Sequence, residues 1–245
     1  MIDINAFERE GFVITGPLFS LPEIHQIATL LEQQTQTNEG PRRGGLRDVL
    51  DNLPAMRDLA DHASIRAIVD QVLGPEAFVV RATLFDKTES SNWKVPWHQD
   101  VTIAVAERID TPGYTPWSNK AGVTHVQPPS QILEHMLTIR VHLDDCPASN
   151  GALRVIPETH KLGKLNQNEV SPYVDEAAAF CCAANVGEAL IMRPLLLHAS
   201  SASQHPGHRR VLHFDYAIGN LSNGLIWRMR QPSLHNHDHG HRLWS

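Results

Sequence analysis

The hydrophobic pattern of the chain changes its period once, near residue 78, and this change restricts the fold class more than any other feature. Before it, two segments carry apolar residues at helical spacing, one after Ser20 and one from Ser64 to Gly74. The first opens with Ser20-Leu-Pro-Glu23, a sequence typical of a capping box. From residue 78 to about residue 218 the pattern is mostly that of β-strands. Helices followed by strands predict an α+β, mainly β domain with its N-terminal helices packed outside a barrel or sandwich.

The length and net charge of the chain restrict the classes of protein to which it can belong. A chain of 245 residues with 42% hydrophobic content predicts a single domain over residues 1–245, ending in a solvated His-rich tail at about 231–245. A formal net charge of -6 argues against a nucleic-acid-binding surface. No apolar run is long enough to cross a membrane, and the first ten residues do not resemble a signal peptide. The odd number of cysteines, three, favours reduced thiols, so we expect a cytoplasmic protein.

Several strands and loops can be assigned in outline. The clearest strand is predicted over residues 131–145, with further strands over 152–156, 187–198 and 209–218 and a bulge or edge position at Pro194. Residues 101–130, with four prolines, are predicted to form a long loop that acts as a lid. A short helix is predicted over residues 175–182. In strand 131–145, Thr138, Arg140 and His142 share one face. That face either lines the barrel and contacts a ligand or is solvated, and alternation alone leaves both readings open.

His98 and Asp100 are the first candidate site residues. Two residues apart in an extended strand, their side chains point to the same face. One imidazole and one carboxylate are two thirds of a non-haem iron site, which needs two histidines and one carboxylate on one side of the metal. The spacing arises by chance in a chain with 15 histidines. The spacing becomes significant only together with His198, a hundred residues later, which could be the second histidine.

The combined pattern resembles the phytanoyl-CoA dioxygenase family. The residues that carry the resemblance are His98-Gln-Asp100, His198 and Arg209, eleven residues after His198. Further similarities are the turn at Asn150-Gly151 with the segment 153–160 that follows it, and Gly187 before the strand that leads to His198. The resemblance covers roughly residues 7 to 220. It implies a double-stranded β-helix (a jelly roll of the cupin type) and an Fe(II)- and 2-oxoglutarate-dependent oxygenase.

The same resemblance implies roles for individual residues. His98, Asp100 and His198 would bind Fe(II) and leave three positions for 2-oxoglutarate and O2. Arg209 would bind the far carboxylate of 2-oxoglutarate, because a guanidinium is a planar double donor, and Ser200 would assist it. Arg210 is the rival of Arg209, but alternation allows only one of the two to point inward. We also assign the cosubstrate pocket two residues of the polar strand face, Thr138 and Arg140.

The expected reaction is hydroxylation of an unactivated C–H bond in a small molecule, with decarboxylation of 2-oxoglutarate to succinate. The carboxylate at Asp100 favours oxygen insertion or desaturation over halogenation, because related halogenases have a small residue there. Two alternatives stay open: a jelly-roll metal enzyme that does not use 2-oxoglutarate, and a metal-binding module without catalysis. The sequence indicates neither the substrate nor the oligomeric state. An anionic group on the substrate is weakly indicated by the arginines near the expected mouth, Arg42, Arg43, Arg47 and Arg140.

Overall fold

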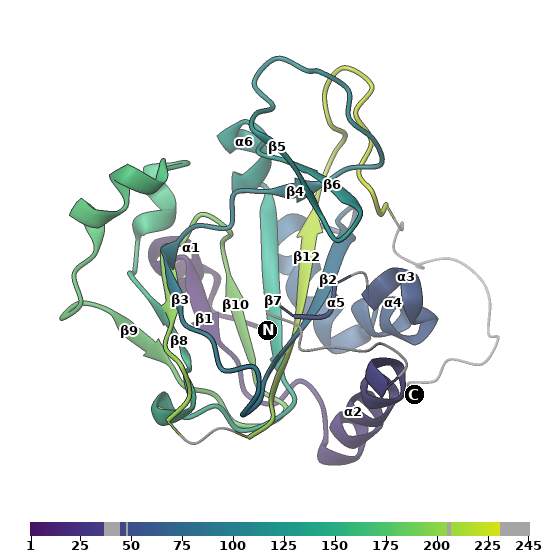
Figure 1. The fold of residues 1–245 in the computed structure, drawn as a ribbon, viewed down its shortest axis with the longest axis vertical. Coiled ribbons are helices and arrows are strands. Elements are labelled where there is room, and N and C mark those ends of the chain that lie inside the picture. The colour runs from purple at the N-terminus through teal and green to yellow at the C-terminus, as the bar shows by residue number, and fades with distance from the viewer. Residues whose placement is uncertain (37–44, 48, 205–206, 231–245) are drawn as a thin grey trace.

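Two antiparallel sheets form the body of the protein. The computed structural model describes residues 1–36, 45–47, 49–204 and 207–230. One sheet has five strands in the order β1-β10-β7-β12-β2, and the other has four in the order β3-β11-β8-β9 (Figure 1). The strands of the first sheet are β1 (Phe12–Ile14), β2 (Phe78–Lys87), β7 (Met136–His142), β10 (Ala189–Met192) and β12 (Arg209–Ala217). Those of the second are β3 (Val95–His98), β8 (Leu153–Val155), β9 (Phe180–Cys182) and β11 (His198–Ser200).

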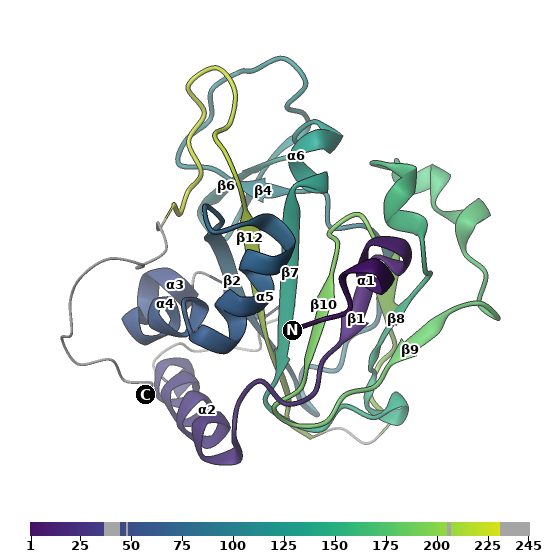
Figure 2. The same cartoon turned by 180° about the vertical axis from the view of Figure 1, so that it is seen from behind.

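Helices cover the outer face of the five-stranded sheet, as Figure 2 shows from behind. They are α1 (Ile4–Glu10), α2 (Leu21–Gln36), α3 (Val49–Asn52), α4 (Pro54–Ala60) and α5 (Ala63–Leu73). The largest hydrophobic cluster lies between these helices and the sheet, where Ile139 and Val141 of β7 are fully buried with Ile65 and Val69 of α5. The predicted fold class, a mainly β jelly roll with N-terminal helices outside, is therefore confirmed, although the two sheets do not close into a barrel.

Helix α2 begins and helix α5 ends at the residues where the sequence predicts helix caps. The backbone N–H of Ser20 donates to the Glu23 carboxylate at 2.7 Å, so α2 begins directly after Ser20, as predicted. Helix α5 ends at Gly74, which has a φ of +87° and donates its N–H to the carbonyl of Asp70. A side chain at this φ would be strained, so glycine suits the end of α5.

The prediction of a structureless loop over residues 101–130 is wrong. This segment contains a third sheet of order β4-β6-β5, made of β4 (Ile103–Ala104), β5 (Trp117–Lys120) and β6 (Val123–Val126). Strands β5 and β6 form a hairpin through Ala121 and Gly122, both at positive φ. Of the four prolines that suggested a loop, Pro112 and Pro116 lie between β4 and β5, and Pro128 and Pro129 follow β6. The next strand, β7, also begins later than predicted, because α6 (Ser130–Glu134) precedes it.

Two further predictions need correction. Residues 175–182 do not form a helix, because their last three residues pair as β9 with β8, and this pairing overrides the helix propensity of the alanines before them. The strand predicted over 187–198 is divided: β10 ends at Met192, the chain turns at Pro194, and β11 starts at His198 in the other sheet. The remaining short elements are 3-10 helices at Ala148–Asn150, Thr159–Leu162, Gln167–Glu169 and Ser171–Tyr173. In the part of the chain that the structure describes, no helix has the length and apolar character of a membrane span. The His-rich tail at 231–245 lies outside the described residues.

Candidate active site

The inner face of the five-stranded sheet carries rows of polar side chains. In the antiparallel register, Asp215 of β12 lies opposite Arg81 of β2 and opposite Thr138 of β7. One row along, His213 lies between Thr83 and Arg140, and at the end of the strand Arg209 lies opposite Lys87. All of these except Arg81 are buried, as is His142. The polar face of β7 therefore lines the interior between the two sheets and is not solvated.

Three candidate metal ligands meet across from these rows, on the four-stranded sheet. His98 at the end of β3 is the register partner of His198 at the start of β11, and Asp100 lies two residues beyond His98. The Nε2 atom of His98 is 3.9 Å from one carboxylate oxygen of Asp100, and the Nε2 atom of His198 is 3.7 Å from the other. One ligand atom from each of the three residues lies within 4.8 Å of the others. The structure thus brings together the three residues that the sequence predicted as ligands.

Backbone hydrogen bonds orient both imidazole rings. The Nδ1 atom of His98 is 2.9 Å from the carbonyl oxygen of Pro96, and that of His198 is 2.8 Å from the carbonyl oxygen of Leu196. A carbonyl only accepts, so Nδ1 carries the proton in both rings and Nε2 keeps its lone pair. Both lone pairs belong to the atoms that face Asp100. This is the tautomer that a metal-binding histidine needs.

Gln99, between two of the candidate ligands, anchors the segment to its surroundings. Its buried side-chain amide donates to the carbonyl oxygens of Gly163 and Leu195 and accepts from the N–H of Leu165, all within 2.8 Å. The N–H of Asp100 donates to the carbonyl of Pro194 at 2.9 Å. These bonds hold Asp100 in place after strand β3 has ended. The sequence offered no sign of this role.

The electrostatics of the site favour the protonation states that bind metal. Burial lowers the pKa of His198, and the neighbouring His98 lowers it further. Burial opposes ionisation of Asp100, but the charges of His198, His98, His213 and Arg81 together outweigh it, so that the pKa of Asp100 falls below its ordinary value. At neutral pH the site therefore presents neutral His198 and ionised Asp100. The side chains of His98 and Asp100 remain 30% and 27% exposed, so the site is open to solvent on that side.

A second cluster, here called the cationic pocket, consists of Lys87, Arg140, His142 and Arg209. Lys87 donates to the hydroxyl of Ser200 at 2.7 Å and to the carbonyl of Ser201. Arg209 donates to the carbonyl of Gly151 at 2.6 Å. Among the described residues, no carboxylate is hydrogen-bonded to any of the four members. Three cationic side chains are therefore buried together without a carboxylate partner from the residues that the structure describes.

Several polar atoms of the cationic pocket lack a partner within the described part of the chain. They are the Nε atoms of Arg140 and Arg209 and both ring nitrogens of His142. Burial and the charge of Arg209 lower the pKa of Lys87 to about 8 and that of Arg140 to about 10. Burial, Arg140 and Arg209 lower the pKa of His142 to about 3. Buried donors without acceptors and repelling cations are the features of a pocket that takes an anion.

Arg209 and Arg210 point to opposite sides, as alternation requires. Arg209 is only 4% exposed and faces the interior. Arg210 makes three hydrogen bonds to Asp144 at 2.8 to 2.9 Å and an ion pair with Glu32 of α2. The side chain available to the cationic pocket is therefore that of Arg209.

Thr138 and Arg140, also assigned to this pocket from the sequence, belong to a hydrogen-bond network centred on Asp215. Thr138 donates to Asp215 at 2.7 Å, His213 contacts the same oxygen at 2.9 Å, and Arg140 contacts the other ring nitrogen of His213 at 2.9 Å. Because Arg140 can only donate, His213 accepts through Nδ1 and donates to Asp215 through Nε2. Thr138 therefore belongs to this network through its hydroxyl. Arg140 belongs both to the network and to the cationic pocket.

Three residues of the interior are missing from the site predicted from the sequence: Lys87, Arg81 and Asp215. A signal for all three was present. Alternation along residues 78–87 puts Arg81 and Lys87 on one face, and alternation along 209–217 puts Asp215 on the face of Arg209. Applied to these strands as it was to β7, the argument would have found them.

Comparison with known proteins agrees with this architecture. The family model described as phytanoyl-CoA dioxygenase matches residues 7–211. No curated protein matches the sequence. Among solved structures, the alpha-ketoglutarate-dependent epimerase SnoN from nogalamycin biosynthesis is 17% identical with a TM-score of 0.65, over 88% of this chain and 81% of that one. HygX from Streptomyces hygroscopicus, with nickel and 2-oxoglutarate bound, is 17% identical with a TM-score of 0.65, over 88% and 85%.

A third solved structure, EctD from S. alaskensis in its apoform, is 18% identical with a TM-score of 0.65, over 87% of this chain and 75% of that one. At such identities the likeness to these structures concerns the fold.

Proposed function

The chain belongs to the phytanoyl-CoA dioxygenase family, and from that premise we propose that it is an Fe(II)- and 2-oxoglutarate-dependent oxygenase. Its reaction is hydroxylation of an unactivated C–H bond of a small molecule, coupled to decarboxylation of 2-oxoglutarate to succinate and CO2. The observation that carries the proposal is the pairing of two unlike sites in one interior. A two-histidine, one-carboxylate group faces a buried cationic pocket in which no carboxylate of the described residues balances the charge.

The donor set suits ferrous iron. His98, Asp100 and His198 would hold the metal through two Nε2 atoms and one carboxylate, and a facial set of this kind leaves positions open for other ligands. Iron bound there supplies the redox chemistry that activates O2. The chain's own contribution is to keep both rings in the metal-binding tautomer through the carbonyls of Pro96 and Leu196.

The cationic pocket suits a dicarboxylate. Arg209 would bind the far carboxylate, because its buried Nε atom has no hydrogen-bond partner in the described part of the chain and a guanidinium can form two parallel hydrogen bonds. Ser200 lies beside it, with a hydroxyl that already accepts from Lys87. Lys87 and Arg140 supply the remaining positive charge. HygX has been solved with 2-oxoglutarate bound, and EctD with 2-oxoglutarate and 5-hydroxyectoine.

Structurally similar proteins are named as an epimerase, a carbocyclase and a monooxygenase. One scaffold therefore carries several outcomes. The carboxylate of Asp100, where related halogenases have a small residue, favours oxygen insertion or desaturation over halogenation, and of these we propose hydroxylation. The two alternatives are a metal enzyme that does not use 2-oxoglutarate and a metal-binding module without catalysis. Unlike the proposed oxygenase, neither would consume 2-oxoglutarate.

The test is the formation of succinate from 2-oxoglutarate by the purified protein with Fe(II) and O2, without added substrate and then with a panel of small molecules. The proposal predicts a slow, metal-dependent basal rate and faster succinate formation with a substrate. The His98→Ala and His198→Ala variants should form none, while the surface variant His208→Ala should match the wild type. Metal-dependent turnover of a substrate without 2-oxoglutarate would overturn the proposal, and so would a metal-loaded protein that forms no succinate with 2-oxoglutarate bound.

A further inference from the structure

A buried carboxylate, Asp215 of β12, lies on the inner face of the five-stranded sheet and belongs neither to the metal group nor to the cationic pocket. It accepts from the Nε atom of Arg81 at 2.6 Å, the hydroxyl of Thr138 at 2.7 Å and the Nε2 atom of His213 at 2.9 Å. Burial opposes ionisation of Asp215, but Arg81 and the other neighbours outweigh it, so its pKa lies well below the ordinary value. Asp215 is therefore an ionised group, held on several sides, around which its neighbours are ordered.

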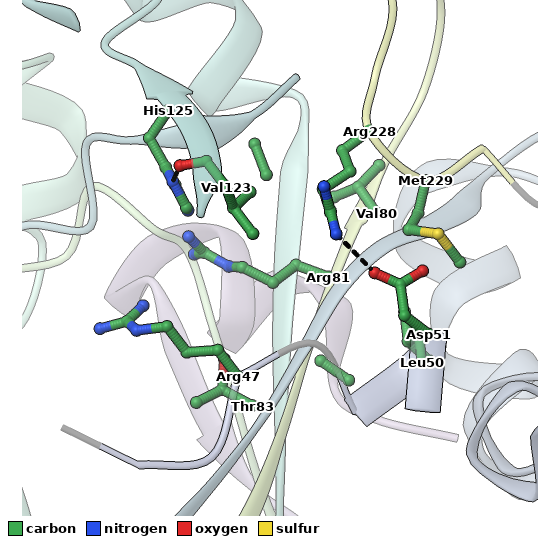
Figure 3. Close-up of a pocket in the computed structure, with 12 residues that line it drawn as sticks. Arg47, Leu50, Asp51, Val80, Arg81, Thr83, Val123, His125, Arg228 and Met229 are labelled. Carbon is green, nitrogen blue, oxygen red and sulfur yellow. Dashed lines mark hydrogen bonds and ion pairs between the residues drawn. The ribbon is translucent and has the colours of Figure 1, made fainter. Parts of the chain in front are cut away.

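Arg81 balances the charge of Asp215, because the two form an ion pair at 2.6 Å. Figure 3 shows the side chain of Arg81 extended from β2 toward His125. A second nitrogen of the guanidinium donates to the carbonyl of Thr102 at 3.3 Å. Since Arg81 already neutralises Asp215, the ring of His213 bonds to this carboxylate without having to carry a charge itself.

His213 offers Arg140 an acceptor that has no negative charge. Its Nδ1 atom is 2.9 Å from a terminal nitrogen of Arg140, and a guanidinium can only donate. A carboxylate in the place of this ring would pair with Arg140 and neutralise it. The neutral imidazole instead fixes the guanidinium by a hydrogen bond and leaves its positive charge for a ligand.

The ring of Phe85, in β2, holds the same two side chains from another direction. The guanidinium carbon of Arg140 lies 5.4 Å from the centroid of this ring, a cation–π contact. The ring of His213 meets it edge-on, with the centroids 5.6 Å apart and the planes at 73°. Even so, the Nε atom of Arg140 has no hydrogen-bond partner among the described residues. The guanidinium is thus fixed while one of its donors stays unused.

Arg140 lies between the two parts of the proposed site. Burial lowers the pKa of His142, in the cationic pocket, and Arg140 is the next cause. Burial and His98 lower the pKa of His198, one of the candidate metal ligands, and Arg140 adds a smaller share. The charge of Arg140 therefore acts on both groups, and a ligand that reaches from the cationic pocket to the metal would lie against it.

We propose that His213 is a positioning residue for 2-oxoglutarate: as a neutral acceptor oriented by Asp215, it fixes Arg140 in the pose that binds the cosubstrate. The inference rests on the proposed oxygenase function and adds how this chain orders one donor of its cosubstrate pocket. With His213 in place, the guanidinium is ordered before 2-oxoglutarate arrives. Without it, binding has to order a long side chain, which weakens affinity about three- to tenfold.

The experiment uses the full chain loaded with Mn(II), a redox-inert substitute for Fe(II). Calorimetry measures 2-oxoglutarate affinity, and Mn(II) affinity and the unfolding midpoint are measured beside it. His213→Phe keeps a ring but removes both hydrogen bonds, so it should weaken 2-oxoglutarate binding about three- to tenfold and change Mn(II) affinity less than about twofold. His213→Gln can accept from Arg140 through its oxygen and donate to Asp215 through its nitrogen, and should restore wild-type affinity to within about twofold.

A double-mutant cycle tests whether His213 acts through Arg140. Arg140→Met should weaken 2-oxoglutarate binding about tenfold or more, and adding His213→Phe should then change it less than about twofold further. Additive losses would overturn the inference. So would a His213→Phe variant with a lower unfolding midpoint but wild-type affinity, because the role of the ring would then be structural only.

Phe85→Leu and Phe12→Leu form a matched pair that alters no buried polar group, so it decides the question even if His213→Phe does not fold. Both rings are half-buried, and Phe12 pairs with Phe180 in β1, at the other edge of the sheet from β2. Phe85→Leu should weaken 2-oxoglutarate binding about threefold or more, and Phe12→Leu less than about twofold. Equal affinities in the pair would overturn the inference and leave the proposed function intact. A Mn(II)-loaded wild type that does not bind 2-oxoglutarate would instead overturn the proposed function, and this inference with it.

Discussion

Arg209 and Arg210 are neighbours in strand β12, yet one is buried in the interior and the other binds Asp144 on the outer side of the sheet. The two differ in their surroundings and not in their chemistry. They therefore form a natural pair for separating a cosubstrate role from a structural one.

The first prediction uses this pair. Arg209→Met should lower the affinity for 2-oxoglutarate about a hundredfold, because a buried carboxylate loses a charged double donor. Arg210→Met should change that affinity by less than about threefold, although it removes contacts to Asp144 and Glu32. Calorimetry with the Mn(II)-loaded protein measures both, and metal affinity serves as the check on folding. Similar losses in the two variants would contradict the assignment.

The second prediction concerns Lys87 and pH. Its pKa of about 8 means that it is charged at pH 7 and loses its proton as the pH rises past 8. A bound dicarboxylate favours the charged form, so 2-oxoglutarate affinity should fall about tenfold per pH unit above 8, with uptake of one proton. In Lys87→Met, affinity should be lower and flat over this range. Lys161→Met, an exposed residue paired with Glu158, is the control and should keep the wild-type slope.

The third prediction concerns acid stability. In the unfolded chain His142 and His125 take up protons near pH 6.5, but in the folded protein only near pH 3 and pH 4. The unfolded state therefore binds more protons below pH 6.5, and stability present above that pH is lost as the pH falls toward 4.

Replacing His142 by Phe should remove part of this dependence, on the order of 3 kcal/mol in the free energy of unfolding at pH 4. Urea titrations at pH 7 and pH 4 measure the difference. His25→Phe, at an exposed position of α2, should retain the wild-type loss. A variant His142→Phe that loses as much stability as the wild type would contradict the assignment of acid sensitivity to this buried ring.

The fourth prediction concerns Gln99. Gln99→Leu removes three hydrogen bonds that hold the loop of Asp100, so metal affinity should fall about 10- to 100-fold, the range for partners that orient ligands. The exposed Gln167, which donates to the carbonyl of Trp97 at 3.4 Å, provides the control Gln167→Leu. Metal titration separates the two, because a purely structural defect in Gln99→Leu would lower the unfolding midpoint and leave metal affinity unchanged.

Much of the fold could be predicted from the sequence, because the features that were predicted depend on interactions between residues close together in the chain. The capping box at Ser20 and the glycine at 74 set helix ends through hydrogen bonds among near neighbours, so no tertiary information is needed. Alternation also placed Arg209 and Arg210 on opposite faces. The three candidate ligands could be named from the family resemblance, and the structure brings their ligand atoms within 4.8 Å of one another.

What the sequence did not reveal depends on pairing between distant segments. Strands β4, β5 and β6 are only two to four residues long and are stabilised by one another and by packing against distant residues such as Phe78 and Trp227. Strand β9 forms because β8 lies beside it. Alternation could have placed Lys87 on the inner face of its strand, but its position opposite Arg209 and its hydrogen bond to Ser200 depend on the pairing of distant strands.

The central claim is that one metal and one 2-oxoglutarate bind side by side in this interior. The most direct measurement is anaerobic calorimetry of 2-oxoglutarate binding to the protein with and without Fe(II), in the wild type and in His198→Ala. The account predicts one 2-oxoglutarate per chain, bound at least about tenfold more tightly when iron is present, with that gain lost in His198→Ala. Binding that is equally tight without iron, or unaffected by the loss of His198, would contradict it.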